Sequence, residues 1–279
     1  MLAETGAAAG SSGSLLDAGR VAQAAGLPAP AVRVVAEADS TNRVLMEAAW
    51  PSAPAAPVVF IARRQTAGRG RLGRTWVSGD DDSLTMSVAL ELTLSAAGGR
   101  LPALSVLAGI EVAECLARRV AGLALKWPND LQRHGRKVAG LLCESRVFGD
   151  RIRVVAGLGV NLLPAPDRLD AVGQPAGALF DDAQSMPERS ELAGELAGAL
   201  IAAIAGDSRP LPPLSVRWAR FDALAGLTVD MISGGLVRDS GVARGIDDGG
   251  ALRVETGAGE RLISVGEVSV RPSPGGAPA

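Results

Sequence analysis

The sequence predicts an α+β fold in which a large domain with a mixed β-sheet is followed by a small β-barrel. The chain has 279 residues, of which 47% are hydrophobic, so it can bury a sizeable core and suggests one large domain with a smaller one. Over residues 31–225, runs of β-branched residues are interspersed with apolar residues at helical spacing. From residue 226 the pattern changes to short strands separated by Gly and Asp turns, which is typical of a small barrel.

The chain is accordingly predicted to have four parts. Residues 1–30 are rich in Ala, Gly and Ser, so we expect a flexible segment with at most one short helix over 15–25. This segment is too short for a winged-helix DNA-binding module. The remaining parts are a large domain at 31–225, a small C-terminal domain at 226–271 and a flexible tail at 272–279.

The first third of the large domain is predicted to hold three strands and one helix. The polar stretch ADSTN contains residues that favour a helix N-cap, and the Pro-rich stretch PSAPAAP separates this helix from the next strand. The strands are rich in β-branched residues, and the third one alternates. The predicted bounds are strands over 32–38, 57–64 and 83–92 and a helix from Ser40 to about Trp50.

The middle of the chain is predicted to form a long helix and a hairpin. Apolar residues at helical spacing over 101–121 predict the longest helix. The stretch LALKW at 123–127 is a short strand, and residues 137–146 and 151–162 form two adjacent strands joined by a short FGD turn.

The last part combines helices with short strands. Residues 164–188 are rich in Pro, Gly and Asp and are predicted to be a loop, followed by helices at about 189–205 and 213–225. The barrel strands are expected in LTVDMIS, LVRDSGVARGIDD, GALRVET and ERLISV, between residues 227 and 265.

Composition excludes several classes of function. The net charge is −2, so no overall positive field recruits nucleic acid. No run reaches the roughly 18 apolar residues of a membrane span, and the N-terminus lacks a basic signal start, so we expect a cytoplasmic protein. Cys115 and Cys143 lie 28 residues apart and suit reduced, structural thiols. The single histidine, His134, lies in a polar turn, which argues against histidine-rich metal sites and predicts no metal ligands.

A local basic segment predicts an anion-binding loop. The stretch ARRQTAGRGRLGRTW, residues 62–76, holds five arginines and three glycines but no acidic residue. Glycine lets the backbone approach a ligand closely, and arginine forks match phosphate or carboxylate oxygens. A flexible RNA-binding tail has a similar composition, but a tail would not lie between two strands. No Gly-Lys-Ser/Thr follows and no helix begins on the glycines, which excludes a P-loop and a Rossmann turn.

Lysine occurs only at Lys126 and Lys137, eleven residues apart, whereas 26 of the 28 basic residues are arginine. A general need for positive charge is therefore met by arginine. The lysine ammonium is a compact, mobile point charge that can follow charge moving on phosphate oxygens. The two lysines can face one cleft, which favours phosphoryl or nucleotidyl transfer. The competing interpretation of WPND is a tight turn with a packed tryptophan.

Six stretches along the chain are the basis of a resemblance to a known family. In order they are ADSTN (38–42), RRQTAGRGRLGRTW (63–76), LKWPNDL (125–131), GRKVAGLLCES (135–145), GLGVNL (157–162) and GVARGIDDGGAL (241–252). Together they resemble the successive motifs of biotin protein ligase. The resemblance spans roughly residues 32 to 271, and GRGRxGRxW followed by KWPND is close to diagnostic. It implies a mixed-sheet catalytic domain of the biotin/lipoate ligase type, similar to class II aminoacyl-tRNA synthetases, followed by an SH3-like barrel.

The resemblance also implies the reaction. The carboxylate of biotin attacks the α-phosphate of ATP in the presence of Mg²⁺, giving biotinyl-5′-AMP and pyrophosphate. A lysine of a biotin carboxyl carrier protein domain then attacks the mixed anhydride. The family further suggests a monomer or weak homodimer and, since residues 1–30 are short, an enzyme that binds neither DNA nor membrane.

The site residues follow from the same resemblance. Lys137 is the expected principal catalyst, Arg71 also acts in catalysis, and Asp130 accepts a proton from or orients the incoming amine. The role of Lys126 is left open between substrate contact and support of the turn. The residues implied for biotin are Ser40, Thr41, Asn42, Gln65, Gly68, Arg69, Arg71, Lys137 and Gly140. Those implied for ATP or the adenylate are Arg69, Gly70, Arg71, Arg74, Trp76, Asn129, Lys137 and Asn161, with Asn129 and Asn161 as contacts to nucleotide or its metal.

One departure and three alternatives accompany the resemblance. Where the family has a sequence close to ATSL after GVNL, this chain has PAGALF, which puts the local helix start in doubt. Lipoate ligase shares the architecture and the adenylation step, although the GRGRxGRxW and KWPND motifs argue against it. The second alternative is a repressor that uses biotinyl-adenylate as corepressor. The third is a catalytically silent binding module.

Overall fold

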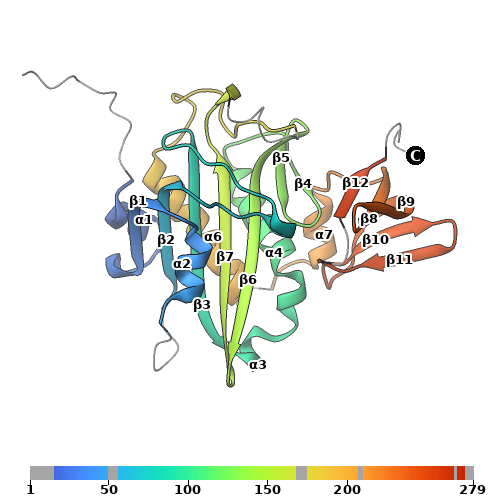
Figure 1. The fold of residues 1–279 in the computed structure, drawn as a ribbon, viewed down its shortest axis with the longest axis horizontal. Helices are drawn as coiled ribbons and strands as arrows, with labels where there is room; N and C mark the ends of the chain where they lie inside the picture. The colour runs from blue at the N-terminus through green and yellow to red at the C-terminus, as the bar shows by residue number, and fades with distance from the viewer. Residues whose placement is uncertain (1–15, 50–55, 168–174, 207–209, 267–268, 274–279) are drawn as a thin grey trace, which may run out of the picture.

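Among the described residues, two β-sheets organise the protein, which is seen as a computed structural model in Figure 1. The structure describes residues 16–49, 56–167, 175–206, 210–266 and 269–273. The strands of the larger sheet are β1 Val32–Ala38, β2 Val58–Gln65, β3 Ser83–Thr93, β4 Leu123–Lys126, β5 Asp130–Arg133, β6 Arg136–Phe148 and β7 Arg151–Asn161. Those of the smaller sheet are β8 Thr228–Ser233, β9 Leu236–Ile246, β10 Leu252–Thr256, β11 Gly259–Ile263 and β12 Ser269–Pro272.

The larger sheet is mixed, as predicted. Its order is β1-β2-β3-β7-β6-β5-β4, in which β1 and β2 are parallel and the other neighbours are antiparallel. The predicted hairpin of β6 and β7 lies in its centre. The predicted small barrel is observed as a five-stranded antiparallel sheet of order β11-β10-β9-β8-β12. The tail was expected from 272, but β12 extends through Pro272, and residues 274–279 lie outside the described residues.

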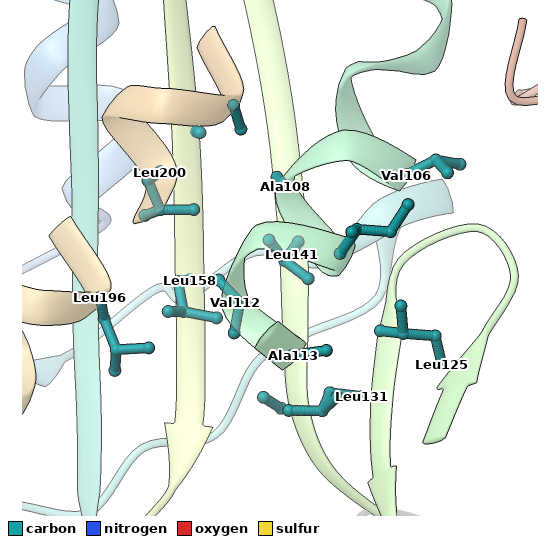
Figure 2. Packing of buried hydrophobic residues seen from close by; sticks show 14 of the residues in the cluster. Val106, Ala108, Val112, Ala113, Leu125, Leu131, Leu141, Leu158, Leu196 and Leu200 are labelled. Carbon is teal, nitrogen blue, oxygen red and sulfur yellow. The ribbon is translucent and has the colours of Figure 1, made fainter. Parts of the chain in front are cut away.

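Helices cover both faces of the larger sheet. They are α1 Ala18–Ala25, α2 Thr41–Glu47, α3 Leu94–Ala97, α4 Leu104–Leu116, α6 Arg189–Ala205 and α7 Leu214–Ala219, with 3₁₀ turns at Ala29–Ala31, Arg71–Gly73 and Gly98–Ala103. Helices α4 and α6 lie on one face, where Val112 and Ala113 pack towards Leu141 of β6 and Leu158 of β7 (Figure 2). Helix α2 lies on the other face, with Leu45 against Phe60 and Val155.

Helix α1 confirms the one short helix expected over residues 15–25, but it packs against the core and so differs from the flexible segment that was expected. Asp17 caps it by accepting a hydrogen bond from the Arg20 amide at 2.8 Å, and Val21 is fully buried against α6. A Cβ on Gly194 of α6 would lie 2.5 Å from Ala24 Cβ, so glycine allows this close approach. The segment is therefore part of the core over these residues; residues 1–15 lie outside the described residues.

Two other helix predictions differ from the structure. Helix α6, with 17 residues, is longer than α4, which has 13 because the segment with Pro102 before it is a 3₁₀ turn. Helix α7 ends at Ala219, well before the predicted residue 225. The chain after it pairs with β4 instead, since Leu125 donates to the Phe221 carbonyl at 2.6 Å and accepts from the Ala223 amide at 2.9 Å.

The stretch Leu94–Leu116 is long and apolar enough to span a membrane by length and composition alone. However, 56% of its most apolar window is buried inside the protein. A core helix of a soluble protein has the same property.

A buried arginine fixes helix α2 to the sheet. This helix contains the predicted site residues Thr41 and Asn42, and Ser40 is its N-cap. Arg153 of β7 lies opposite Glu91 of β3, and its Nε donates to Glu91 Oε1 at 3.0 Å. The same guanidinium donates to the carbonyl groups of Leu45 and Ala49 at 3.0 Å each, where helix α2 ends. Arg153 thus satisfies the carbonyl groups that a helix C-terminus leaves unpaired.

We predict that Arg153→Met lowers the free energy of unfolding by about 3–5 kcal/mol, because it leaves Glu91 and the helix carbonyl groups buried with fewer partners. Urea titration followed by circular dichroism measures this change. The matched control is Arg64→Met, which removes an exposed pair with Glu37 on the same sheet and should leave the free energy of unfolding nearly unchanged. Equal effects of the two variants would contradict the assigned role.

Candidate active site

A cavity of about 750 Å³ opens where the larger sheet meets β12 of the smaller one. The predicted site residues that line it are Ser40, Thr41, Asn42, Gln65, Arg69, Gly70, Arg71, Arg74, Trp76, Asn129, Asp130, Lys137, Gly140 and Asn161. Gly68 does not line it, whereas Lys126, whose role was left open, does. Residues 269–272 of β12 also line it and were not predicted. Among the described residues, no three His, Cys, Asp or Glu side chains cluster as metal ligands would.

The floor of the cavity is a patch of sheet in which three residues are glycines. Gly140 of β6 lies opposite Gly159 of β7, and Gly157 lies opposite Leu142. Residues opposite each other in an antiparallel pair face the same side, so the three glycines share one face. Gly157 and Gly159 were not among the predicted site residues. Their alternation in GLGVNL is the signal that could have identified them, because glycine inside a strand often marks a close approach.

The Trp76 ring covers part of this floor. A Cβ on Gly159 would lie 2.3 Å from Trp76 Cε2, and one on Gly140 would lie 3.5 Å from Trp76 Cζ3. The indole Nε1 is buried and has no hydrogen-bond partner among the described residues. The Lys137 ammonium lies 5.9 Å from the ring centroid. The ring thus separates the Gly157 end of the floor from Lys137.

Gly68 shapes the arginine loop from outside the cavity. Its carbonyl accepts a hydrogen bond from the Trp76 amide at 3.0 Å, and a Cβ on it would lie only 2.4 Å from the Trp76 carbonyl oxygen. Between these residues the chain folds back on itself, since the Gly70 amide donates to the Arg74 carbonyl at 2.7 Å. Leu72, at the tip, has φ 54 and is 66% exposed.

Two arginines of the loop reach towards other elements. Arg71 Nη1 donates to Asn129 Oδ1 at 3.2 Å, and Arg69 forms an ion pair with Glu144 of β6 at 3.0 Å. Burial lowers the pKa of the Arg71 guanidinium, while the charge of Asp130 opposes this shift. Buried positive charge at the cavity wall is suited to an anionic ligand.

Lys126 and Lys137 line the same cavity. Lys137 Nζ lies 2.8 Å from Asp130 Oδ1, and both side chains are more than four-fifths buried. Asp130 is opposite Lys126 on β4 and opposite Gly140 on β6, so the sheet register brings the three positions into one row. Burial lowers the pKa of the Lys126 ammonium, and Asp130 again opposes the shift.

The WPND turn is supported from the C-terminal sheet. Trp127 is 2% exposed, and its Nε1 donates to the Gly250 carbonyl at 3.0 Å. Gly250 has φ 83, and a Cβ on it would lie 2.8 Å from Ala103 Cβ. The GIDDGGAL stretch therefore fits between α4 and the turn because residue 250 has no side chain. On the other side of the turn, Asn129 Nδ2 donates to the Leu141 carbonyl at 2.8 Å.

A polar cluster forms the opposite end of the cavity. Gln65 Oε1 accepts a hydrogen bond from the Thr41 amide at 2.8 Å, and it lies 3.2 Å from Thr41 Oγ1. Gln65 therefore caps helix α2, whereas Ser40, at the N-cap position, makes no side-chain cap bond. Ser87 Oγ of β3 lies 2.7 Å from Thr41 Oγ1. The cavity is thus lined by neutral polar groups at this end and by charged groups at the other.

Asn161 also lines the cavity and is 4% exposed. Its Nδ2 donates to the Gly177 carbonyl at 3.1 Å. The Lys137 amide donates to the Pro175 carbonyl at 2.9 Å, so residues 175–177 of the PAGALF stretch run beside Lys137. This stretch is extended there, with no helix start over residues 175–180.

Comparison with known families gives two matches. Residues 34–161 match the biotin/lipoate A/B protein ligase family, and residues 228–271 match the biotin protein ligase C terminal domain.

Individual relatives cover most of the chain. A biotin–[acetyl-CoA-carboxylase] ligase of Mycobacterium tuberculosis is 34% identical over 84% of this chain and 87% of its own length. A bifunctional ligase/repressor of Escherichia coli is 35% identical over 86% of this chain and 74% of its own. The biotin protein ligase from Aquifex aeolicus, solved in complex with biotin and ATP, has a TM-score of 0.66 and 25% identity over 87% of this chain and 99% of its own.

We predict that Gly159→Ala displaces the Trp76 ring without disturbing the sheet, because the new Cβ meets only side-chain atoms that border an open cavity. The tryptophan emission maximum should shift, and the free energy of unfolding should change by less than about 1 kcal/mol. Gly99→Ala is the control, since a Cβ there meets nothing within 4 Å. The emission shift should vanish in a Trp76→Phe background; a shift that persists there would contradict the assignment.

Proposed function

The chain belongs to the biotin protein ligase family, and we propose that it joins biotin to a lysine of a biotin carboxyl carrier protein domain through biotinyl-5′-AMP. One observation carries this proposal. A single cavity joins a neutral polar cluster, a glycine floor, the arginine loop and the Lys137–Asp130 pair. The polar cluster suits an uncharged ring, and the glycine floor suits a flat part of a ligand. The arginine loop and the Lys137–Asp130 pair suit a reacting carboxylate and phosphate.

Biotin would bind with its ureido ring at the cluster of Ser40, Thr41 and Gln65. Hydroxyl and amide groups match an uncharged ring, because a charged side chain buried there would lack a partner. The ring would lie near Gly157, and the valeryl chain would cross the floor towards Lys137. The indole of Trp76 covers the floor between these ends and has to move when the ligand extends across it.

In the first step, a carboxylate oxygen of biotin attacks the α-phosphorus of ATP, the bond from this phosphorus to the bridging oxygen breaks, and pyrophosphate leaves. Two anions must approach each other, so positive charge at their meeting point lowers the barrier. Lys137, together with Arg69, Arg71 and Arg74 of the loop, supplies this charge. Lys137 exchanges its contact with Asp130 for the phosphate oxygens as the reaction proceeds.

In the second step, the amine of the carrier lysine attacks the acyl carbon, the carbon–oxygen bond to AMP breaks, and the amine loses a proton. Asp130 is placed beside Lys137 to accept this proton once Lys137 contacts the phosphate. Closure of residues 68–76 over the adenylate would keep water from the anhydride until the carrier arrives.

Magnesium would enter with ATP. The described residues contain no cluster of His, Cys, Asp or Glu that could hold the ion, so its ligands would be mainly phosphate oxygens and water. The side-chain amide oxygens of Asn129 and Asn161 at the cavity wall would be the protein groups near it. The ion would supply charge neutralisation on the phosphates.

The remaining parts of the proposal concern organisation and partners. Residues 31–225 form the catalytic domain, and residues 226–271 support it through the Trp127–Gly250 bond. The acceptor is the carrier domain of a biotin-dependent carboxylase, in agreement with the names of the relatives. We further propose a cytoplasmic monomer or weak homodimer that binds no DNA, in keeping with a net charge of −2.

We predict that the purified protein exchanges labelled pyrophosphate into ATP when biotin is present, because exchange reports the first step and needs no carrier. Parallel reactions with lipoate and with no acid define the substrate. Exchange with lipoate alone would reject a biotin ligase in favour of a lipoate ligase, and no exchange with either acid would reject adenylation.

We predict that Lys137→Arg lowers the rate of biotin-dependent exchange about 100-fold, although it keeps the charge, because the planar guanidinium cannot follow the phosphate as a compact ammonium does. Lys137→Ala should lose at least as much. The control is Arg146→Lys, an exposed arginine of the same strand β6 that does not line the cavity. A Lys137→Arg variant as active as the wild type would refute the need for lysine.

A further inference from the structure

Glu144 of β6 lies behind the polar cluster and does not line the cavity. Its Oε2 accepts a hydrogen bond from Asn42 Nδ2 at 2.8 Å. The same nitrogen donates to the Leu142 carbonyl at 2.9 Å. An amide nitrogen has two hydrogens, so both are committed to acceptors within the protein.

The orientation of the Asn42 amide is therefore fixed. With Nδ2 towards Glu144 and Leu142, Oδ1 points to Ser87 Oγ, which donates to it at 2.6 Å. A Cβ on Gly157 would lie 2.1 Å from this Oδ1, so the amide fills the space that the glycine leaves. Asn42 is 3% exposed.

This orientation propagates to the residues that face the cavity. A hydroxyl has one hydrogen, and that of Ser87 is used on Asn42, so Ser87 can only accept from Thr41 Oγ1. The Thr41 hydroxyl hydrogen is then used on Ser87, and the hydrogen bond from Thr41 to Gln65 is the one from the amide. Gln65 Oε1 accepts from the Thr41 amide, so Nε2 is the Gln65 atom left to donate, and Gln65 lines the cavity. The Glu144 carboxylate and the Leu142 carbonyl thus together set the direction of a chain of hydrogen bonds that runs through Asn42, Ser87 and Thr41.

Glu144 also holds the arginine loop. The oxygen that accepts from Asn42 lies 3.0 Å from Arg69 Nη2, and the two side chains are 28% and 44% exposed. One carboxylate oxygen therefore joins the ring-binding end of the cavity to the loop that covers it.

We propose that Glu144 is a positioning residue for biotin. It acts through Asn42, whose own role is to orient the cluster rather than to donate to the ligand, and through Arg69, which it keeps at the cavity in the absence of ligand. This inference rests on the proposed function, because biotin is the ligand whose affinity it sets.

Two substitutions of Glu144 distinguish its contact with Asn42 from its contact with Arg69. In Glu144→Gln, the new amide oxygen can still accept from Asn42, but the charge that holds Arg69 is lost. Glu144→Ala loses both. Glu37→Gln is the matched control, since it removes an exposed ion pair with Arg64 on the same sheet, away from the cavity.

In pyrophosphate exchange, Glu144→Ala should raise the KM for biotin about 10- to 100-fold and leave the KM for ATP and kcat nearly unchanged. Glu144→Gln should recover most of this loss. In the ligand-free protein, both variants should be cut by trypsin within residues 69–74 faster than the wild type, with fragments assigned by mass spectrometry. Glu37→Gln should change neither property.

The inference is overturned if Glu144→Ala has the wild-type KM for biotin, or if it raises both KM values and lowers kcat together, as general damage would. If the wild-type protein shows no biotin-dependent exchange, the proposed function itself is rejected instead. The trypsin comparison is independent of activity, and equal cleavage of all variants would contradict the contact between Glu144 and the loop.

Discussion

The antiparallel register of β6 against β7 is the constraint on which the site depends. It places Gly140 opposite Gly159 and Gly157 opposite Leu142, so three glycines lie together on one face near the centre of a wide sheet. On the same row, β5 adds Asp130. A shift of one residue would turn these positions to the core face, where α4 and α6 pack. The hydrophobic pattern of β6 and β7 therefore fixes the floor of the cavity as well as the core.

The site is also a junction between the two sheets. The WPND turn carries Asn129 and Asp130, yet its Trp127 is held by a carbonyl of residue 250, more than a hundred residues later in the chain. Residues of β12 line the same cavity. The C-terminal sheet thus contributes to the geometry of the charged end, while α2, fixed by Arg153, contributes the neutral end. Two separate parts of the fold thus form the two ends of one cavity.

Local patterns in the sequence predicted much of this arrangement. Alternation and β-branched runs located β2, β3, β6 and β7, and the concentration of arginine and glycine located the loop. Strands β5 and β12 were missed because DLQR and SVRP have little apolar character and are held by their neighbours in the sheet. Ser87 and Glu144 could not be assigned from sequence, since each gains its role only through the register that places it behind Asn42.

We propose that biotin and the α-phosphate meet over the glycine floor beside Lys137. A crystal structure with biotin and a non-hydrolysable ATP analogue tests it most directly. The account predicts the ureido ring at Thr41 and Gln65, the Trp76 ring displaced from Gly159, and Lys137 Nζ at hydrogen-bond distance from both the carboxylate and the α-phosphate. Phosphates held by the loop arginines alone, with the Lys137–Asp130 pair intact, would contradict it.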